Sequence, residues 1–169
     1  APLKAFSVDA SNCPDLFPII SVLAAFCQGT SRLAGVGRLA NKESDRAKAI
    51  LEMLDQMGVK ASVEDDVMTI EGHSLAQRLL NQGSGSDSEC LESSVSGCDQ
   101  SLVSGKYVSH GLLKGGSYTS HHDHRMVMAL KVAALGADSP ITIDDEDCVA
   151  KSFPQFHETF EAIVGGRAM

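Results

Sequence analysis

The fold of this 169-residue chain is decided by the stretch KESDRAKAILEMLDQMG at positions 42–58. Its apolar side chains recur every three or four residues and therefore share one face of a helix. Ser44 is a good N-cap for a helix that begins near that residue. Gly58 is a typical residue just past the last turn. The stretch predicts an amphipathic helix whose start lies in a charged loop.

The residues around this helix complete a βαβαββ order for residues 1–72. A strand, a largely apolar helix and a second strand are predicted before it, over Lys4–Val8, Pro14–Gln28 and Thr30–Val36. Two short strands are predicted after it, over Val59–Val63 and Val67–Ile70, with an acidic turn between them that favours a hairpin.

The second half repeats part of this order. Strands are predicted within Lys106–Leu113, Ser117–Thr119 and Pro140–Ile143, and helices over Arg125–Leu135 and Pro154–Val164. An internal repeat aligns Asp15 with Asp123, because each opens an apolar helix and is followed by a lysine, Lys42 or Lys151, 27 or 28 residues later. The second copy, 106–169, lacks the closing ββ pair and is predicted to be an incomplete unit.

The segment 83–105 differs from the rest in composition. Serine, glycine and acidic residues dominate it, and it contains no lysine or arginine. Such a segment buries too little apolar surface to offset its chain entropy. We expect a mobile surface insertion here.

The overall composition excludes several classes of partner. The formal net charge of −8 argues against nucleic acid or an anionic membrane, both of which normally require a basic face. No apolar run approaches the roughly 20 residues that cross a bilayer, so a cytoplasmic protein is expected. The five cysteines are scattered and form no CxxC pair, which favours reduced structural thiols.

Four motifs place charged groups beside predicted helix starts. Lys42 and Arg46 flank a helix N-terminus, whose free N–H groups and dipole already favour an anion. Arg125 in HHDHR (121–125) and Lys151 before a proline-started helix repeat that arrangement. Asp9 ends the first strand and can act as a base or cap a turn. Taken singly, each motif also fits a capped helix, a polar loop or a surface charge.

Zinc is the alternative for His121, His122 and His124, but adjacent loop histidines lack the usual ligand geometry and no cysteine pair accompanies them. If the helices enter from one side, the cations and acids of all four motifs face one cleft. A small substrate that carries both phosphate and carboxylate would suit such a cleft.

The motifs resemble those of the EPSP synthase (3-phosphoshikimate 1-carboxyvinyltransferase) family. Their order is the same, through Asn12-Cys13-Pro14-Asp15, Lys42-Glu43-Ser44-Asp45-Arg46, Asp123-His124-Arg125-Met126 and Ala150-Lys151-Ser152-Phe153-Pro154. The resemblance implies an α/β (α+β) fold, the inside-out α/β barrel of βαβαββ units of enolpyruvyl transferases. About one and two-thirds units would be present, as a partial C-terminal domain over 1–169.

The resemblance also implies a reaction, enolpyruvyl transfer from phosphoenolpyruvate to the 5-hydroxyl of shikimate 3-phosphate. It assigns Asp9 as the base, Glu43 as the proton donor and Lys42 as the lysine between the substrates. The phosphoenolpyruvate cations would be Arg46, Arg125 and Lys151, with His124 lining the same cleft. No metal and no organic cofactor would be required.

The chain lacks the family's Gly-Ser-Lys-Ser-like loop and its Ser-Ser-Gln segment. The resemblance therefore implies that the missing N-terminal domain of the same enzyme is a partner and that the fragment is inactive alone. Two other hypotheses are a non-catalytic anion-binding or interaction module, and an intact transferase for another alcohol. The second is disfavoured because 169 residues cannot hold both domains.

Overall fold

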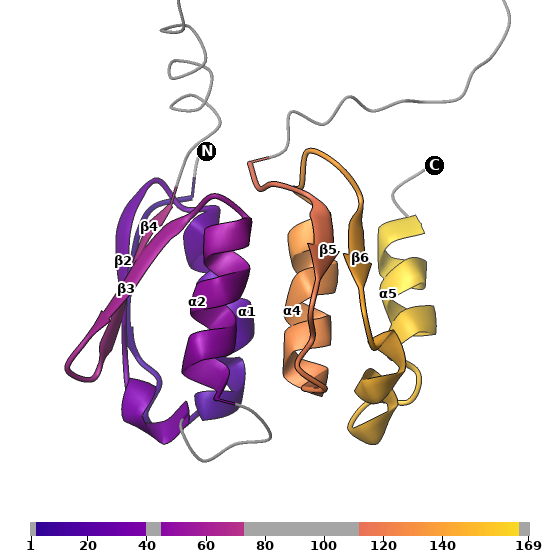
Figure 1. The fold of residues 1–169 in the computed structure, drawn as a ribbon, viewed down its shortest axis with the longest axis horizontal. Coiled ribbons are helices and arrows are strands. Elements are labelled where there is room, and N and C mark those ends of the chain that lie inside the picture. The colour runs from indigo at the N-terminus through magenta and orange to yellow at the C-terminus, as the bar shows by residue number, and fades with distance from the viewer. Residues whose placement is uncertain (1–2, 40–44, 73–111, 166–169) are drawn as a thin grey trace, which may run out of the picture.

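The computed structural model describes residues 3–39, 45–72 and 112–165. It is a mixed α/β structure in which helices α1, α2 and α4 lie between two sheets, as Figure 1 shows. The larger sheet has four strands in the order β1-β2-β4-β3, and the smaller sheet pairs β5 with β6. The predicted fold class, with helices inside and sheets outside, is confirmed.

The first part of the chain forms a parallel βαβ unit. Strand β1 (Ser7–Asp9) leads through the 3₁₀ turn η1 (Pro14–Leu16) into α1 (Phe17–Ala25), and β2 (Gly29–Ala34) returns parallel to β1. The predicted helix Pro14–Gln28 is therefore shorter and begins with a 3₁₀ turn. Proline fits this start because the first helical residues need no N–H donor.

A helix and a hairpin complete the four-stranded sheet. After η2 (Val36–Leu39), α2 (Arg46–Gln56) leads to β3 (Lys60–Glu64) and β4 (Val67–Gly72), which pair antiparallel as predicted. The N-cap of α2 is Asp45, which accepts a hydrogen bond from the N–H of Lys48, and not Ser44 as predicted. Ser44 lies outside the described residues.

The second part of the chain forms another parallel βαβ unit. Strand β5 (Gly116–Tyr118), α4 (His124–Ala134) and β6 (Ile141–Ile143) are followed by the 3₁₀ helix η3 (Glu146–Lys151) and by α5 (Phe156–Gly165). Helix α5 begins two residues later than predicted, because Pro154 and Gln155 form a turn. The insertion predicted at 83–105 and most of the strand predicted at Lys106–Leu113 lie outside the described residues.

The two units share one hydrophobic core, in which α1 packs against α4. Phe17 and Val22 of α1, and Met126 and Leu130 of α4, are fully buried there. Helices α1, α2, α4 and α5 all begin at the lower edge of the molecule in Figure 1, where β1, β2, β5 and β6 end. The predicted one-sided entry of the helices is therefore observed.

Among the described residues, no helix is both long enough and apolar enough to cross a membrane.

Candidate active site

The edge of the structure at which the helices begin is called the helix-start edge. At its centre lies a buried arginine that joins the two βαβ units. Arg46, the first residue of α2, has a side chain that is 2% exposed. Its Nε lies 2.7 Å from Oδ2 of Asp123, and its Nη2 lies 3.2 Å from Oδ1 of the same carboxylate. This is the two-pronged contact in which guanidinium and carboxylate match best. Arg46 therefore ties the start of α2 to the start of α4.

Asp123 holds this position because it also caps α4. Its side chain is fully buried, and its Oδ1 accepts a hydrogen bond of 2.9 Å from the N–H of Arg125. An N-cap carboxylate is favoured at this end of the helix dipole. The buried carboxylate of Asp123 thus caps α4 and also binds Arg46, which is 77 residues away in the sequence.

A second carboxylate, Asp15 of η1, lies between two guanidiniums. Its Oδ1 accepts a hydrogen bond of 2.8 Å from Nη1 of Arg46, and its Oδ2 is 3.8 Å from Nη2 of Arg125. The Asp15 side chain is 48% exposed, so it is the solvent-facing member of the cluster. Burial disfavours the charge of Arg46, but its bonds to Asp123 and Asp15 outweigh this and raise its pKa.

The loop before α4 is fastened by the carboxylate of Asp144, at the end of β6. Asp144 accepts hydrogen bonds from the N–H and hydroxyl of Ser120, at 2.8 and 2.9 Å, and from the hydroxyl of Thr119 at 2.6 Å. Above all the Ser120 N–H, and then the hydroxyls, lower the pKa of Asp144 to about 2. The loop is therefore held by a carboxylate that is ionised at neutral pH.

Two adjacent histidines in this loop have left-handed backbones. The φ angles of His121 and His122 are 53° and 57°, which is uncommon for residues other than glycine. His122 Nδ1 is 2.7 Å from Oδ2 of Asp145, and the His122 carbonyl accepts a hydrogen bond of 3.5 Å from Nζ of Lys151. The loop thereby connects Lys151 of η3 with the start of α4.

Asp9 lies at the end of β1, on the same edge but on its own loop. One carboxylate oxygen accepts hydrogen bonds from the hydroxyl and the N–H of Ser11, at 2.5 and 2.9 Å. These two bonds, the hydroxyl first, lower the pKa of this exposed carboxyl. Asp9 is therefore ionised at neutral pH.

The structure brings some of the predicted site residues together. Arg46 and Arg125 both contact Asp15, and Lys151 contacts the loop that leads to Arg125. Arg125 keeps a buried Nε with no hydrogen-bond partner in the described part of the chain. His124 is the first residue of α4 and is partly buried. Lys42 and Glu43 lie outside the described residues.

The arginine partners were missed by sequence reasoning. Asp15 and Asp123 stood out only as helix openers, whereas each binds a guanidinium. The available signal was the presence of two acidic residues at helix starts in a chain that also has an arginine at a helix start. Within residues 3–39, 45–72 and 112–165, no group of three or more histidine, cysteine, aspartate or glutamate side chains is arranged to hold a metal ion.

Comparison with solved structures defines the class of protein. The enolpyruvyl transferase NikO from Streptomyces tendae aligns with 94% of this chain and 28% of its own, at a TM-score of 0.53 and 14% identity, which shows the fold. EPSP synthase from Acinetobacter baumannii covers 86% of this chain and 26% of its own, at a TM-score of 0.60 and 31% identity. The chain has the enolpyruvyl transferase fold.

The family is defined by sequence. The model for EPSP synthase (3-phosphoshikimate 1-carboxyvinyltransferase) matches residues 1–160, and the chain belongs to that family. The 3-phosphoshikimate 1-carboxyvinyltransferase of Clostridium acetobutylicum is 34% identical over 94% of the chain, and that of Methanocorpusculum labreanum is 38% identical over 92%. The chain spans about 28% of the length of each relative.

Proposed function

We propose that this chain carries one wall of the active site of a 3-phosphoshikimate 1-carboxyvinyltransferase. The reaction would transfer the enolpyruvyl group from phosphoenolpyruvate to the 5-hydroxyl of shikimate 3-phosphate, in the cytoplasm. The observation that carries this proposal is the gathering of Arg46, Arg125 and Lys151 at one edge, where α1, α2, α4 and α5 begin. Preorganised cations of this kind bind an anionic substrate and stabilise a leaving phosphate.

The proposed proton transfers need one base and one acid. A base removes the proton of the 5-hydroxyl, whose oxygen bonds to C2 of phosphoenolpyruvate while an acid adds a proton to C3. The tetrahedral intermediate then loses a C3 proton and releases phosphate with the C–O electron pair. Asp9 is proposed as the base and Glu43 as the acid.

The state of Asp9 suits this role in one respect. Its lowered pKa keeps the carboxylate ionised at neutral pH and ready to accept a proton. The same bonds from Ser11 weaken it as a base, so transfer requires the substrate hydroxyl to be held close. Glu43 would instead need a raised pKa, from burial or from the substrate.

Lys42 is proposed to lie between the two substrates, and His124 to line the cleft. In the sequence Lys42 precedes Arg46 by four residues, and His124 is the first residue of α4, next to Arg125. No metal or organic cofactor has a role in this chemistry.

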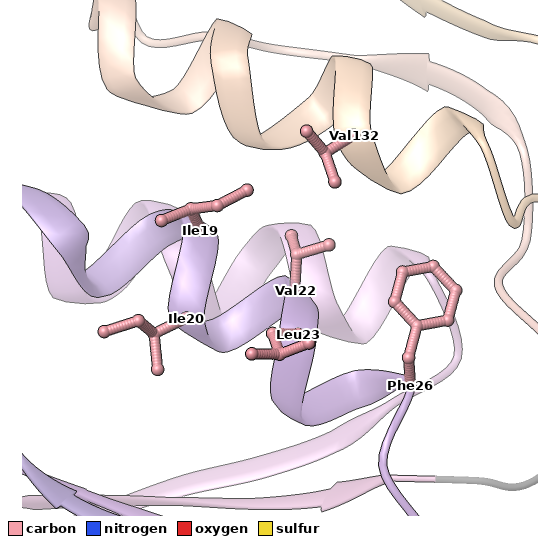
Figure 2. A pocket seen from close by; sticks show the side chains of 6 residues that line it. All are labelled: Ile19, Ile20, Val22, Leu23, Phe26 and Val132. Atoms are coloured by element: carbon pink, nitrogen blue, oxygen red, sulfur yellow. The ribbon is translucent and has the colours of Figure 1, made fainter. Parts of the chain in front are cut away.

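We propose that the remainder of the same protein covers an apolar groove between α1 and α4. Figure 2 shows Val132 of α4 facing Ile19 and Val22 of α1, in a cavity of about 220 Å³ that Leu23 and Phe26 also line. Leu23 is 46% exposed, and the β5–β6 sheet has only two strands in the described residues. Since the chain spans about 28% of its relatives, a helix of the remaining protein is the natural occupant.

Docking in the groove is tested by introducing a charged side chain into its lining. Leu23→Asp in the chain should weaken association with the separately expressed remainder at least about tenfold, because it buries an unpaired carboxylate. Ile163→Asp is the matched change of an exposed apolar residue on α5. Equal affinity for Leu23→Asp and the unchanged chain would exclude the groove as the docking face.

The second candidate is a non-catalytic anion-binding module with the same fold. It is favoured by the position of Arg46 between two carboxylates, where the side chain is only 2% exposed and serves the framework. The more exposed Arg125, at 35%, would then bind an anion without the full set of cations that the reaction needs. Such a module would bind phosphate without turnover.

The test is phosphate release from phosphoenolpyruvate and shikimate 3-phosphate. The chain alone should be inactive, and the chain co-expressed with the remainder of the protein should be active. Lys42→Ala and Glu43→Ala should abolish that activity. An associated but inactive complex would instead support the anion-binding module.

A further inference from the structure

The turn between β3 and β4 lies at the same edge of the four-stranded sheet as Asp9 (Figure 1). In the sheet, Asp9 of β1 pairs with Ala34 of β2, and Ala34 pairs with Val67 at the start of β4. The turn that precedes Val67 is therefore two strands away from Asp9. The loop after β1 and the segment that leads into η2 leave the sheet between them. A residue of the turn can therefore support the loop that follows Asp9.

Asp66, the last residue of this turn, binds three consecutive backbone N–H groups after β2. Its carbonyl accepts hydrogen bonds from the N–H groups of Gly35 and Val36, at 2.9 and 3.2 Å. Its carboxylate Oδ1 accepts a third hydrogen bond, of 2.6 Å, from the N–H of Gly37. The first N–H groups of a helix have no partner within it, and η2 begins at Val36. Asp66 thus holds the segment 35–37 with both its backbone and its side chain.

The segment 35–37 lies directly against Ser11. Gly35 is buried and has a φ of +100°, and a Cβ on it would lie 2.6 Å from the backbone nitrogen and 2.7 Å from Oγ of Ser11. Only a glycine permits this close approach. The N–H of Ala10 also donates to the carbonyl of Ala34, at 3.0 Å. The segment that Asp66 holds therefore sets the position of residues 10 and 11.

Ser11 in turn holds the carboxylate of Asp9. Its hydroxyl and its N–H both donate to Oδ1 of Asp9, at 2.5 and 2.9 Å. Because both bonds reach the same oxygen, they fix the direction in which the other oxygen, Oδ2, points. A general base must lie within hydrogen-bond reach of the proton that it removes. A shift of Ser11 would therefore move Asp9 relative to the substrate hydroxyl.

The Asp66 side chain is exposed, and its bond to Gly37 lies at the surface. Loss of one exposed hydrogen bond is a small part of the stability of a domain. Removal of the carboxylate should therefore leave the fold intact, so that an effect on activity can be separated from unfolding.

We propose that Asp66 is a positioning residue for Asp9 that acts through the segment 35–37 and Ser11. The turn fixes the segment, the segment fixes Ser11, and Ser11 directs the Asp9 carboxylate towards the substrate hydroxyl. This inference rests on the proposed function for the role of Asp9. The contacts between Asp66 and Ser11 can be measured without turnover.

The test compares Asp66→Ala with Asp66→Asn in the full-length protein. Alanine removes the acceptor for the N–H of Gly37, whereas asparagine keeps a carbonyl oxygen there. In Asp66→Ala the kcat for enolpyruvyl transfer should fall about tenfold, because displacement of a base costs much of its rate. In Asp66→Asn the kcat should stay within about twofold of the unchanged protein. The Kd for phosphoenolpyruvate should be the same in both variants, because Asp9 is proposed to act on the other substrate.

The second measurement is amide hydrogen exchange at Ser11, whose N–H donates to Asp9. Exchange should be about tenfold faster in Asp66→Ala, because the segment that holds the loop is loosened, and unchanged in Asp66→Asn. Glu71→Ala is the matched control, since it removes an exposed carboxylate from the other end of β4 and should alter neither kcat nor exchange. Thermal unfolding of each variant verifies that the fold is intact.

The outcomes separate the positioning role from the proposed function. A folded Asp66→Ala variant with unchanged kcat, or with unchanged exchange at Ser11, would overturn the positioning role. An equal loss of kcat in Asp66→Asn would also overturn it, because the acceptor oxygen is retained there. Absence of transfer by the unchanged protein would overturn the proposed function, and exchange at Ser11 would still decide whether Asp66 holds the loop.

Discussion

The two βαβ units use the same backbone turn but fasten it differently. After β1, the N–H of Cys13 donates to the carbonyl of Ala10 at 2.9 Å, and after β5, the N–H of Asp123 donates to that of Ser120 at 3.0 Å. These turns pair Cys13 with Asp123, a separation of 110 residues, whereas the strand partners Ser7–Arg32 and Gly116–Ile141 repeat at a separation of 109. Both separations exceed the 108 residues between Asp15 and Asp123, so the predicted alignment is wrong by one or two residues.

Counted from the turns, Asp15 and Arg125 lie at equivalent positions, each two residues beyond the donor of the turn. Opposite charges at one repeated position then face each other across the contact of the two units, 3.8 Å apart. The repeat thus determines where the residue lies in each unit. The side chain at that position determines whether it is the arginine or the carboxylate of the ion pair.

The loop supports differ in the same way. In the first unit the loop lies close against Gly35, where a Cβ would be 2.6 Å from the backbone nitrogen of Ser11, and Ser11 also donates to the carboxylate of Asp9 in its own unit's first strand. In the second unit the carboxylate of Asp144 reaches across to Ser120 and Thr119. The first loop thus depends on a close backbone contact with Gly35, whereas the second depends on a carboxylate from the neighbouring strand, so the two loops should respond to different substitutions.

The largest effect is expected from breaking the link between the units. Asp123→Ala leaves the charge of Arg46 buried and removes the cap of α4, so unfolding free energy should fall by about 3–5 kcal/mol. Urea denaturation of the full-length protein measures this. Asp45→Ala, which removes only the exposed cap of α2, should cost about 1 kcal/mol. Equal losses for the two variants would contradict the buried link.

Alanine substitutions at two glycines distinguish the cost of a collision with Ser11 from the cost of backbone strain alone. Gly35 has φ +100°, and Gly35→Ala should cost about 3 kcal/mol because strain and collision with Ser11 add. Gly116 of the second unit has φ +136° but open space around it, so Gly116→Ala should cost only about 1 kcal/mol. Similar losses of unfolding free energy would show that the collision with Ser11 is relieved by movement.

The smallest effect on the free energy of unfolding is expected from the hydrogen bonds between Asp144 and the loop before α4. The folded pKa of Asp144, about 2, lies below its ordinary value of 3.8, so its contribution is present above about pH 4 and is lost as pH falls towards 2. Because the side chain is exposed, Asp144→Asn should cost at most about 1 kcal/mol at pH 7. Its stability difference from the unchanged protein, followed by urea unfolding, should vanish near pH 2. A difference that persists there would contradict this support.

Local patterns predicted most of the fold. The apolar spacing of 42–58 gave α2, and the acidic turn at 64–66 gave the β3–β4 hairpin, because both depend on neighbours in the sequence. The cap of α2 was misplaced by one residue, since Ser44 and Asp45 are both good caps. The 3₁₀ start at Pro14 disguised the register of the repeat.

The candidate site was predicted less completely. Arg46 and Arg125 were recognised at helix starts, but the partners of Arg46 lie 31 and 77 residues away in the sequence, and only packing of α1 against α4 brings them together. No local sequence pattern therefore predicts that Asp15 and Asp123 both bind Arg46. Helix-start cations look the same in sequence whether they are open to ligand or held by acids.

The central claim is that this helix-start edge is the reacting wall of an enolpyruvyl transferase. The most direct measurement is single-turnover transfer from phosphoenolpyruvate to shikimate 3-phosphate by the full-length protein and its Glu43→Gln variant. We predict rapid formation of the enolpyruvyl product by the unchanged protein. In Glu43→Gln we predict at least about a hundredfold loss of rate with phosphoenolpyruvate still bound. An unchanged rate in Glu43→Gln, or no product from the unchanged protein, would contradict the account.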